Sequence, residues 1–202
     1  LGILAAALLL RLLFWLPYYL PGDVLNYLNA WDIYADRGIG NPMHAVRLGM
    51  TLPLTLMRWF SGDGHLWNTI YILASSLGTV CLSYLLAYCW GGAGAGFLAG
   101  VTMALVPMEI VYGTVLLPDA PLSFLALASF ACLVQAQEAS DDKKWPWVLA
   151  AGFLLGLAYT CKVTALFLVL PAVAQVYFLR RGIGLVAIFA AAIGFVIAAE
   201  NL

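Results

Sequence analysis

Residues 67–90, WNTIYILASSLGTVCLSYLLAYCW, decide the fold class of this chain. This run holds no Asp, Glu, Lys or Arg. A membrane-spanning helix needs about 20 consecutive, mostly apolar residues, so we predict such a helix over 66–90. Directly after it, Gly91-Gly92-Ala93-Gly94 predicts a very tight turn, because glycine clusters interrupt helices. The chain then becomes apolar again, and a second spanning helix is predicted over 94–116.

The composition of the whole chain is that of a membrane protein. Of its 202 residues, 64% are apolar and 9% are charged, and the mean hydropathy is +0.98. Soluble domains carry about 25% charged residues. The formal net charge is -1, so the chain lacks the basic surface that nucleic acid requires, and we expect no nucleic-acid partner. The four cysteines have no metal-binding or redox spacing, which favours small buried apolar side chains.

Seven apolar segments predict an all-α, polytopic protein with a single transmembrane module over 1–202. Residue 1 already lies inside an apolar run, and no tail follows the last run, which predicts a piece of a longer chain. The first run lacks the basic start and the cleavage site of a signal peptide. The predicted spanning helices are 1–20, 66–90, 94–116, 121–137, 147–161, 163–179 and 183–199.

The predicted outer loop, 21–65, begins with the first substantial polar segment, LPGDVLNYLNAWDIYADRGIGNPMHAVR at 20–47. Apolar residues recur at helical spacing over 23–36, with Asn and Asp on the other side. This pattern predicts an amphipathic juxtamembrane helix lying in the membrane interface. A second interfacial helix is predicted over 44–60, broken near Pro53.

Ionisable residues that are far apart in sequence fall on one membrane face when seven crossings are counted. They are Asp23, Glu109, Asp119 and Lys162. Each also has a simpler explanation. Asp23 fits a helix N-cap, and Asp119 fits a turn between prolines. Lys162 fits a lysine that extends to the interface, and Glu109 fits a packing role or an ion pair with Arg11.

Taken together, these groups fit the transfer of a group from a lipid phosphate. A carboxylate within hydrogen-bond reach can take the proton of an attacking hydroxyl. Arg and Lys can hold a phosphate, Arg by bidentate contact and Lys as a point charge. These groups would lie at a membrane surface beside apolar helices. The expected ligand is therefore phospholipid-like or a polyprenyl phosphate. The second carboxylate would then orient the acceptor or bind a divalent cation.

Three segments resemble the GT-C-fold glycosyltransferases that use dolichyl- or undecaprenyl-phosphate sugars. This group includes protein O-mannosyltransferases and the bacterial aminoarabinose transferase of lipid A. The resemblance covers essentially the whole chain, as the N-terminal membrane part of such an enzyme. The segments are Arg11 followed by Gly22-Asp23 and Tyr27, VYGTVLLPDAPLSFLALASF at 111–130, and WVLAAGFLLGLAYTCKVTALFLVLP at 147–171. The chain departs from the family where Val24 follows Asp23, and at 47–56, RLGMTLPLTL, which lacks the usual Pro-Pro or Lys-Pro.

The resemblance implies a role for four of these residues. It implies that Asp23 is the catalytic base and that Asp119, in the Asp-x-Pro-Leu turn, is a second active-site carboxylate. It also implies that Lys162 and Arg47 bind the donor phosphate. The implied reaction is inverting transfer of a sugar from a polyprenyl-phosphate donor to a hydroxyl acceptor.

Further residues are candidates for support, and a cofactor is left open. The supporting candidates are Glu109, His44, Tyr27 and Arg11. A divalent metal cation is a candidate cofactor, with Asp23 and Asp119 as its candidate ligands. The expected partners are membrane lipid, a polyprenyl-phosphate-linked sugar donor, and an acceptor protein, lipid or glycan.

The expected location is a bacterial inner membrane or the endoplasmic reticulum, with several membrane crossings. The basic residues of the short loops favour placing 137–146 and 180–182 in the cytoplasm, which puts the active site on the periplasmic, lumenal or extracellular face. Two other functions remain open. One is a transporter or flippase of a lipid-linked or small polar substrate, because transporters also keep ionisable residues within the membrane. The other is a structural subunit of a larger membrane complex.

Overall fold

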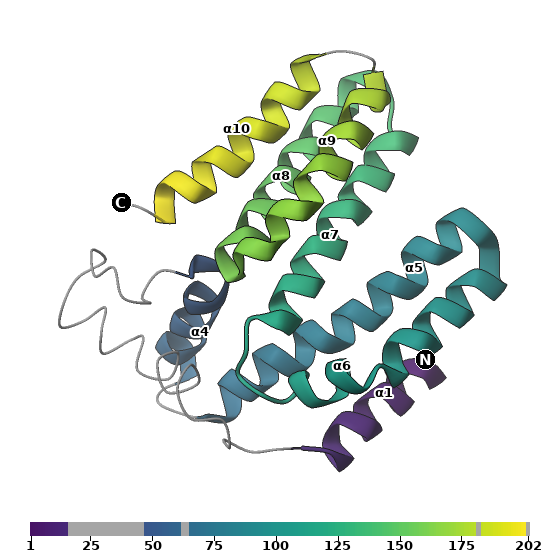
Figure 1. Cartoon of the computed structure of the whole chain (residues 1–202), viewed down its shortest axis with the longest axis vertical. Helices are drawn as coiled ribbons and strands as arrows, with labels where there is room; N and C mark the ends of the chain where they lie inside the picture. Colours follow the sequence, from purple (N-terminus) through teal and green to yellow (C-terminus); the bar gives the residue numbers. More distant parts are fainter. Residues whose placement is uncertain (16–46, 62–64, 181–182, 201–202) are drawn as a thin grey trace.

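The computed structural model describes residues 1–15, 47–61, 65–180 and 183–200 (Figure 1). Within these ranges every regular element is a helix, which confirms the predicted all-α class. The elements are α1 (Gly2–Leu13), α4 (Leu48–Ser61), α5 (His65–Leu105), α6 (Pro107–Tyr112), α7 (Asp119–Glu138), η1 (Asp141–Lys143), α8 (Lys144–Cys161), η2 (Val163–Ala165), α9 (Leu166–Arg180) and α10 (Ile183–Glu200). The predicted interfacial helix 23–36 lies outside the described residues.

Three helical stretches among the described residues are long and apolar enough to cross a membrane. They are Thr69–Leu105, Asp119–Glu138 and Ile183–Glu200. Shorter apolar helices cover Gly2–Leu13, Leu48–Met57 and Val163–Leu179. The count of seven spans therefore stays a prediction, because several segments fall short of the length that a span needs.

The helix α5 contains the tight turn that the glycine cluster predicts. Gly92 has φ 74° and ψ −168°, a backbone conformation open to glycine because it has no Cβ. The chain reverses there, and Figure 1 shows the two arms of α5 running back along each other. A Cβ on Gly96 would lie 3.0 Å from the carbonyl oxygen of Tyr84, so the two arms pack closely.

Two predicted helices have different ends in the structure. The predicted span 94–116 stops at Leu105, and α6 follows after Val106. Pro107 cannot donate a backbone hydrogen bond and disfavours the helical region for the preceding residue, and Val106 accordingly has φ −59° and ψ 117°. The predicted helix 1–20 also ends early, at Leu13.

A third correction concerns α4, which the sequence predicted to break near Pro53. The helix runs through Pro53 to Ser61 without a break. Pro53 has no N–H to donate to the carbonyl oxygen of Gly49, four residues earlier, but that oxygen accepts a hydrogen bond from the hydroxyl of Tyr71 at 2.7 Å instead.

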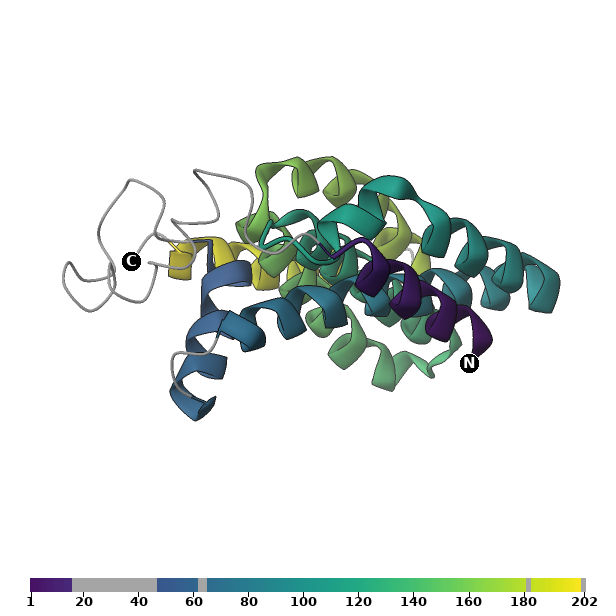
Figure 2. The same cartoon turned by 90° about the horizontal axis from the view of Figure 1, so that it is seen from below.

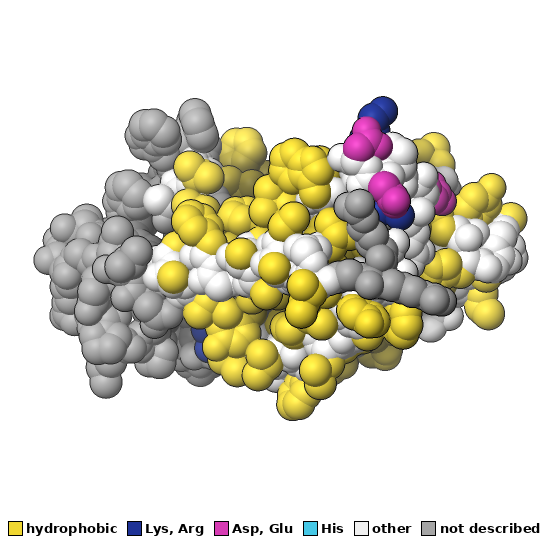
Figure 3. All heavy atoms as spheres, turned by 90° about the horizontal axis from the view of Figure 1, so that it is seen from above, with side chains coloured by type: hydrophobic (Ala, Val, Ile, Leu, Met, Phe, Trp, Pro, Cys, Tyr) yellow, Lys and Arg dark blue, Asp and Glu magenta, His cyan; other side chains and the backbone are white. Residues whose placement is uncertain are grey.

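The main core lies between α7, α8, α9 and α10. Leu133 of α7, Leu155 of α8, Val176 of α9 and Phe189 of α10 are all fully buried. Outward-facing residues are also apolar: Phe167 and Phe178 of α9 are 81% and 72% exposed. Figure 3 shows the resulting mostly hydrophobic surface. Such a surface is typical of helices whose surroundings are lipid.

Small residues allow α8 and α10 to approach closely. A Cβ on Gly152 would lie 2.6 Å from the carbonyl oxygen of Phe189, and one on Gly156 would lie 2.9 Å from Cβ of Val196. These contacts confirm the tight helix contact that the Gly-x-x-x-Gly spacing indicates.

Replacing Gly152 by Ala is expected to destabilise the protein by about 1–3 kcal/mol, the usual effect of overpacking. The added methyl group meets backbone of α10, which cannot rotate away. Gly194→Ala is the matched control on α10, because nothing lies within 4 Å of a Cβ there; it should be neutral or stabilising by up to about 1 kcal/mol. Thermal unfolding in detergent measures both, and equal effects of the two variants would contradict the packing argument.

The helix directions bring separate chain segments to a common end of the bundle. α7 and α8 are antiparallel, so the start of α7 and the end of α8 lie together, beside α4 and the end of α10. Figure 2 shows this end from below. At the opposite end, the α7–α8 connection is charged, and Lys144 Nζ lies 2.7 Å from Asp141 Oδ1. Figure 3 shows acidic and basic side chains gathered at that end.

Candidate functional site

Asp119 and Lys162 form an ion pair at the first end of the bundle. Lys162 Nζ lies 2.8 Å from Asp119 Oδ1, and the two side chains are 42% and 32% exposed. The pair is therefore within reach of a ligand from outside the helices. The sequence prediction that these two residues meet at one face agrees with this geometry, while their chemical roles stay predictions.

The local backbone explains why these two side chains meet. Asp119 is the first residue of α7, where a carboxylate is favoured by the helix dipole. Lys162 directly follows α8, where a cation is favoured for the same reason. Its backbone is extended, with φ −158° and ψ 129°, so α8 stops there and η2 begins. The ends of two antiparallel helices thus present opposite charges to each other.

Arg47 lies at the same end of the bundle, directly before α4. The first turn of α4 is fixed on the end of α8, because the backbone N–H of Gly49 donates to Thr160 Oγ1 at 2.8 Å. The hydroxyl of Tyr71 in α5 donates to the carbonyl oxygen of Gly49 at 2.7 Å. A side chain on Gly49 would run into Cys161 Sγ. Arg47 is therefore held near the residue that precedes Lys162.

The last residue of α10 also contributes to this end. Glu200 interacts electrostatically with Arg47 and with the backbone of Leu48. Glu200, Thr160 and Tyr71 were not predicted to be site residues from the sequence. Their polarity next to apolar runs was a visible signal, but the partners that they contact on other helices are set by the packing.

Arg11 and Glu109 lie deeper than the exposed pair. Arg11 is fully buried, and its Nε donates to the hydroxyl oxygen of Ser76 at 2.8 Å. Ser76 Oγ lies 3.3 Å from Glu109 Oε2. The packing or ion-pair role with Arg11 that the sequence offered for Glu109 takes this form: the two charges interact, and the Ser76 hydroxyl lies between them. Sequence reasoning missed Ser76, although a Ser-Ser pair inside an apolar run was a signal.

The pKa of the Glu109 carboxyl is raised above its ordinary value by burial. Its interaction with Ser76 and the positive charge of Arg11 oppose this shift. Glu109 belongs to α6, which begins after the apolar stretch ending at Leu105. Its carboxyl therefore sits at the boundary between buried and accessible surroundings.

Three predicted site residues, Asp23, Tyr27 and His44, lie outside the described residues. A metal site also remains a prediction. In the part of the chain that the structure describes, no group of three or more His, Cys, Asp or Glu side chains comes together. Asp119 Oδ1 contacts an ammonium group instead. The described side chains thus do not form a metal site by themselves, and we assign no step to a metal.

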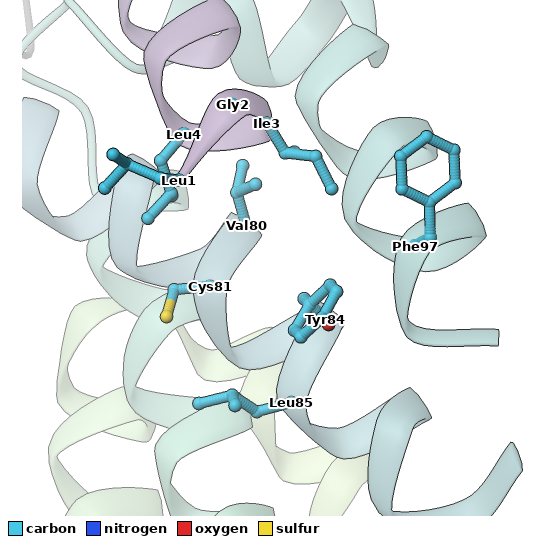
Figure 4. A pocket seen from close by; sticks show the side chains of 9 residues that line it. All are labelled: Leu1, Gly2, Ile3, Leu4, Val80, Cys81, Tyr84, Leu85 and Phe97. Atoms are coloured by element: carbon cyan, nitrogen blue, oxygen red, sulfur yellow. The ribbon is translucent and has the colours of Figure 1, made fainter. Parts of the chain in front are cut away.

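An apolar cavity of about 500 Å³ lies apart from these polar groups (Figure 4). It lies between the start of α1 and the two arms of α5. Its walls are almost entirely hydrocarbon and offer no charged group. The lining residues are Leu1, Gly2, Ile3, Leu4, Val80, Cys81, Tyr84, Leu85 and Phe97.

A family model matches this chain over the segment that carries Asp119 and Lys162. Residues 67–180 match the family described as dolichyl-phosphate-mannose-protein mannosyltransferase. The chain is also 32% identical over 122 residues to a protein of Bacillus subtilis (strain 168) named "Putative mannosyltransferase YycA". That match covers 60% of this chain and 17% of the relative's length. No solved structure matches the chain.

Proposed function

The chain belongs to the dolichyl-phosphate-mannose-protein mannosyltransferase family, and we propose that it is the membrane part of a glycosyltransferase. The proposed enzyme moves a sugar from a polyprenyl-phosphate donor to a hydroxyl acceptor, with inversion. The acceptor is a protein, a lipid or a glycan, and the reaction takes place at the periplasmic, lumenal or extracellular face. The family description and the relative's name make mannose the first sugar to test.

The observation that carries this proposal is the half-exposed Asp119–Lys162 pair at the end of the helix bundle. A lysine that is held by a neighbouring carboxylate and lies beside apolar helices is suited to bind the phosphate of a lipid-linked donor. Arg47 lies at the same end and can add a second positive charge. The location of Asp119, Lys162 and Arg47 at one end of the bundle favours transfer chemistry over transport, which would need ionisable groups along a path through the membrane.

The proposed reaction has one bond-forming and one bond-breaking event at the anomeric carbon. The acceptor oxygen attacks this carbon from the side opposite the phosphate, and its proton passes to the carboxylate of Asp23. The bond between the anomeric carbon and the phosphate oxygen breaks, and its electron pair stays on the phosphate. Lys162 and Arg47 stabilise the charge of the departing polyprenyl phosphate. Asp119 keeps the Lys162 ammonium directed toward that phosphate.

The full-length protein, reconstituted in liposomes with polyprenyl-phosphate mannose labelled in the sugar, tests this proposal. We expect the label to move to a hydroxyl-bearing acceptor peptide or glycan, with free polyprenyl phosphate accumulating in equal amount. Liposomes without protein provide the control. If the intact labelled donor instead crosses the bilayer without cleavage, the transporter alternative replaces the transferase.

A further inference from the structure

A buried polar chain connects α1 to the start of α7 through α5 and α6. Arg11 lies in α1, Ser76 in α5 and Glu109 in α6, and the side chains of Arg11 and Ser76 are fully buried. A buried charge is costly unless it is paired and hydrogen-bonded. Arg11 meets this requirement in part, through Nε, which donates to Ser76 at 2.8 Å, and Nη1, which donates to the carbonyl oxygen of Ala7 at 3.1 Å.

The direction of these hydrogen bonds follows from the chemistry of the three groups. An arginine side chain only donates, so Ser76 must accept from Arg11. The single proton of the Ser76 hydroxyl is then free to donate to Glu109, whose Oε2 and carbonyl oxygen lie 3.3 Å and 3.4 Å away. Ser76 therefore links a cation on one side to a carboxylate on the other.

The connection from α6 to α7 packs directly on this polar chain. A Cβ on Gly113, which ends α6, would lie 2.7 Å from Ser76 Oγ and 3.0 Å from Arg11 Nε. Thr114 and Val115, which follow, are each only 5% exposed. Only a glycine fits against the Arg11–Ser76 contact, so the turn that leads to Asp119 is positioned by that contact.

Glu109 also contacts α7 itself. Its carboxylate interacts with the hydroxyl of Ser123, and it lies close enough to Asp119 for their charges to interact. Ser123 is four residues after Asp119, so both lie on the same face of the first turns of α7. Together with the packing of Gly113 on the Arg11–Ser76 contact, these interactions place the buried polar chain beside the helix turn from which Asp119 reaches Lys162.

We propose that Ser76 is a positioning residue, which couples buried Arg11 to Glu109 and so holds Asp119 in place to direct Lys162. This inference rests on the proposed transferase function for its effect on catalysis. Its structural part is independent of that function, because the Asp119–Lys162 pair can be probed chemically. Ser76→Ala would remove the acceptor of Arg11 Nε. Among the described residues, Arg11 Nη2 already has no hydrogen-bond partner, so the variant would leave a second donor unsatisfied.

The activity test uses the full-length protein in liposomes. Ser76→Ala is expected to reduce kcat/KM for the polyprenyl-phosphate donor by roughly tenfold or more, the scale of one hydrogen bond to a charged group. Ser76→Thr keeps the hydroxyl and should restore most of the activity. Adding Ser76→Ala to Asp119→Asn should cause little further loss. Full additivity of the two losses would overturn the positioning role.

Thr79→Val is the matched control, because the Thr79 hydroxyl is also buried in α5 but donates only to its own helix, to the carbonyl oxygen of Ser75.

The second measurement does not depend on activity. The rate at which an amine-acylating reagent modifies Lys162 is followed by mass spectrometry. Asp119→Asn should raise this rate by removing the ion pair, and Ser76→Ala should raise it in the same direction, while Thr79→Val should not. An unchanged rate in Ser76→Ala beside a raised rate in Asp119→Asn would overturn the inference, whether or not sugar transfer is detected. If Ser76→Ala does not fold, Glu109→Gln takes its place with the same expected result.

Discussion

Lys162→Gln is expected to lower kcat/KM for the polyprenyl-phosphate donor by roughly 10- to 100-fold, because hydrogen bonds to charged groups contribute about 1.5–3 kcal/mol. The loss should appear both as a higher KM for the donor, because Lys162 binds the donor phosphate, and as a lower kcat, because the charge on the departing phosphate grows in the transition state. The variant removes the positive charge beside the donor phosphate and leaves the Asp119 carboxylate, now unpaired, to repel it. Initial rates of sugar transfer at a series of donor concentrations measure this effect.

Two lysine variants separate the role of charge from that of structure. Lys162→Arg keeps the positive charge next to Asp119 and should retain much of the activity. Lys143→Gln makes the same change on the exposed lysine of η1, at the opposite end of the bundle, and should have no effect. If Lys143→Gln and Lys162→Gln reduce transfer equally, the phosphate site does not lie at Lys162.

The shared location of Asp119 and Lys162 at one end of the bundle could be predicted from the sequence because it depends only on helix order, whereas their direct contact depends on packing. Each apolar run reverses the direction of the chain, so the start of α7 and the end of α8 fall at one end however the helices pack. The Gly-rich turn in α5 was equally predictable, because Gly92 needs a backbone conformation that other residues avoid. The close contact at Gly152 follows from its spacing to Gly156.

Features that depend on side-chain packing could not be predicted in the same way. An association of Arg11 with Glu109 could be inferred, but the structure places Ser76 between them, and a serine in an apolar run does not reveal its partner on another helix. The end of α5 was also placed too late. Hydrophobicity continues past Leu105, whereas the break comes from the missing backbone donor of Pro107 and its effect on Val106.

Asp23→Asn should have the largest effect on catalysis, a loss in kcat of roughly 10²–10⁴-fold, the usual contribution of a general base. The role of Asp23 comes from the family resemblance and from its position at the start of the amphipathic pattern over 23–36. Asparagine has nearly the same shape as aspartate but cannot take the proton of the acceptor hydroxyl. Because binding of the donor phosphate is assigned to Lys162 and Arg47, the KM for the donor should change little.

Single-turnover transfer from labelled donor, with a binding measurement for the unlabelled donor, separates these two effects in Asp23→Asn. Asp36→Asn is the control, since it makes the same substitution in the same predicted loop, on the polar side of the same pattern. It should transfer sugar at the normal rate. Near-normal turnover in Asp23→Asn would remove Asp23 as the base.

Asp119 would then be the carboxylate to test for that role, but its Oδ1 already accepts a hydrogen bond from Lys162 at 2.8 Å. The proton of the acceptor hydroxyl would then have to pass to the other carboxylate oxygen of Asp119 or to water.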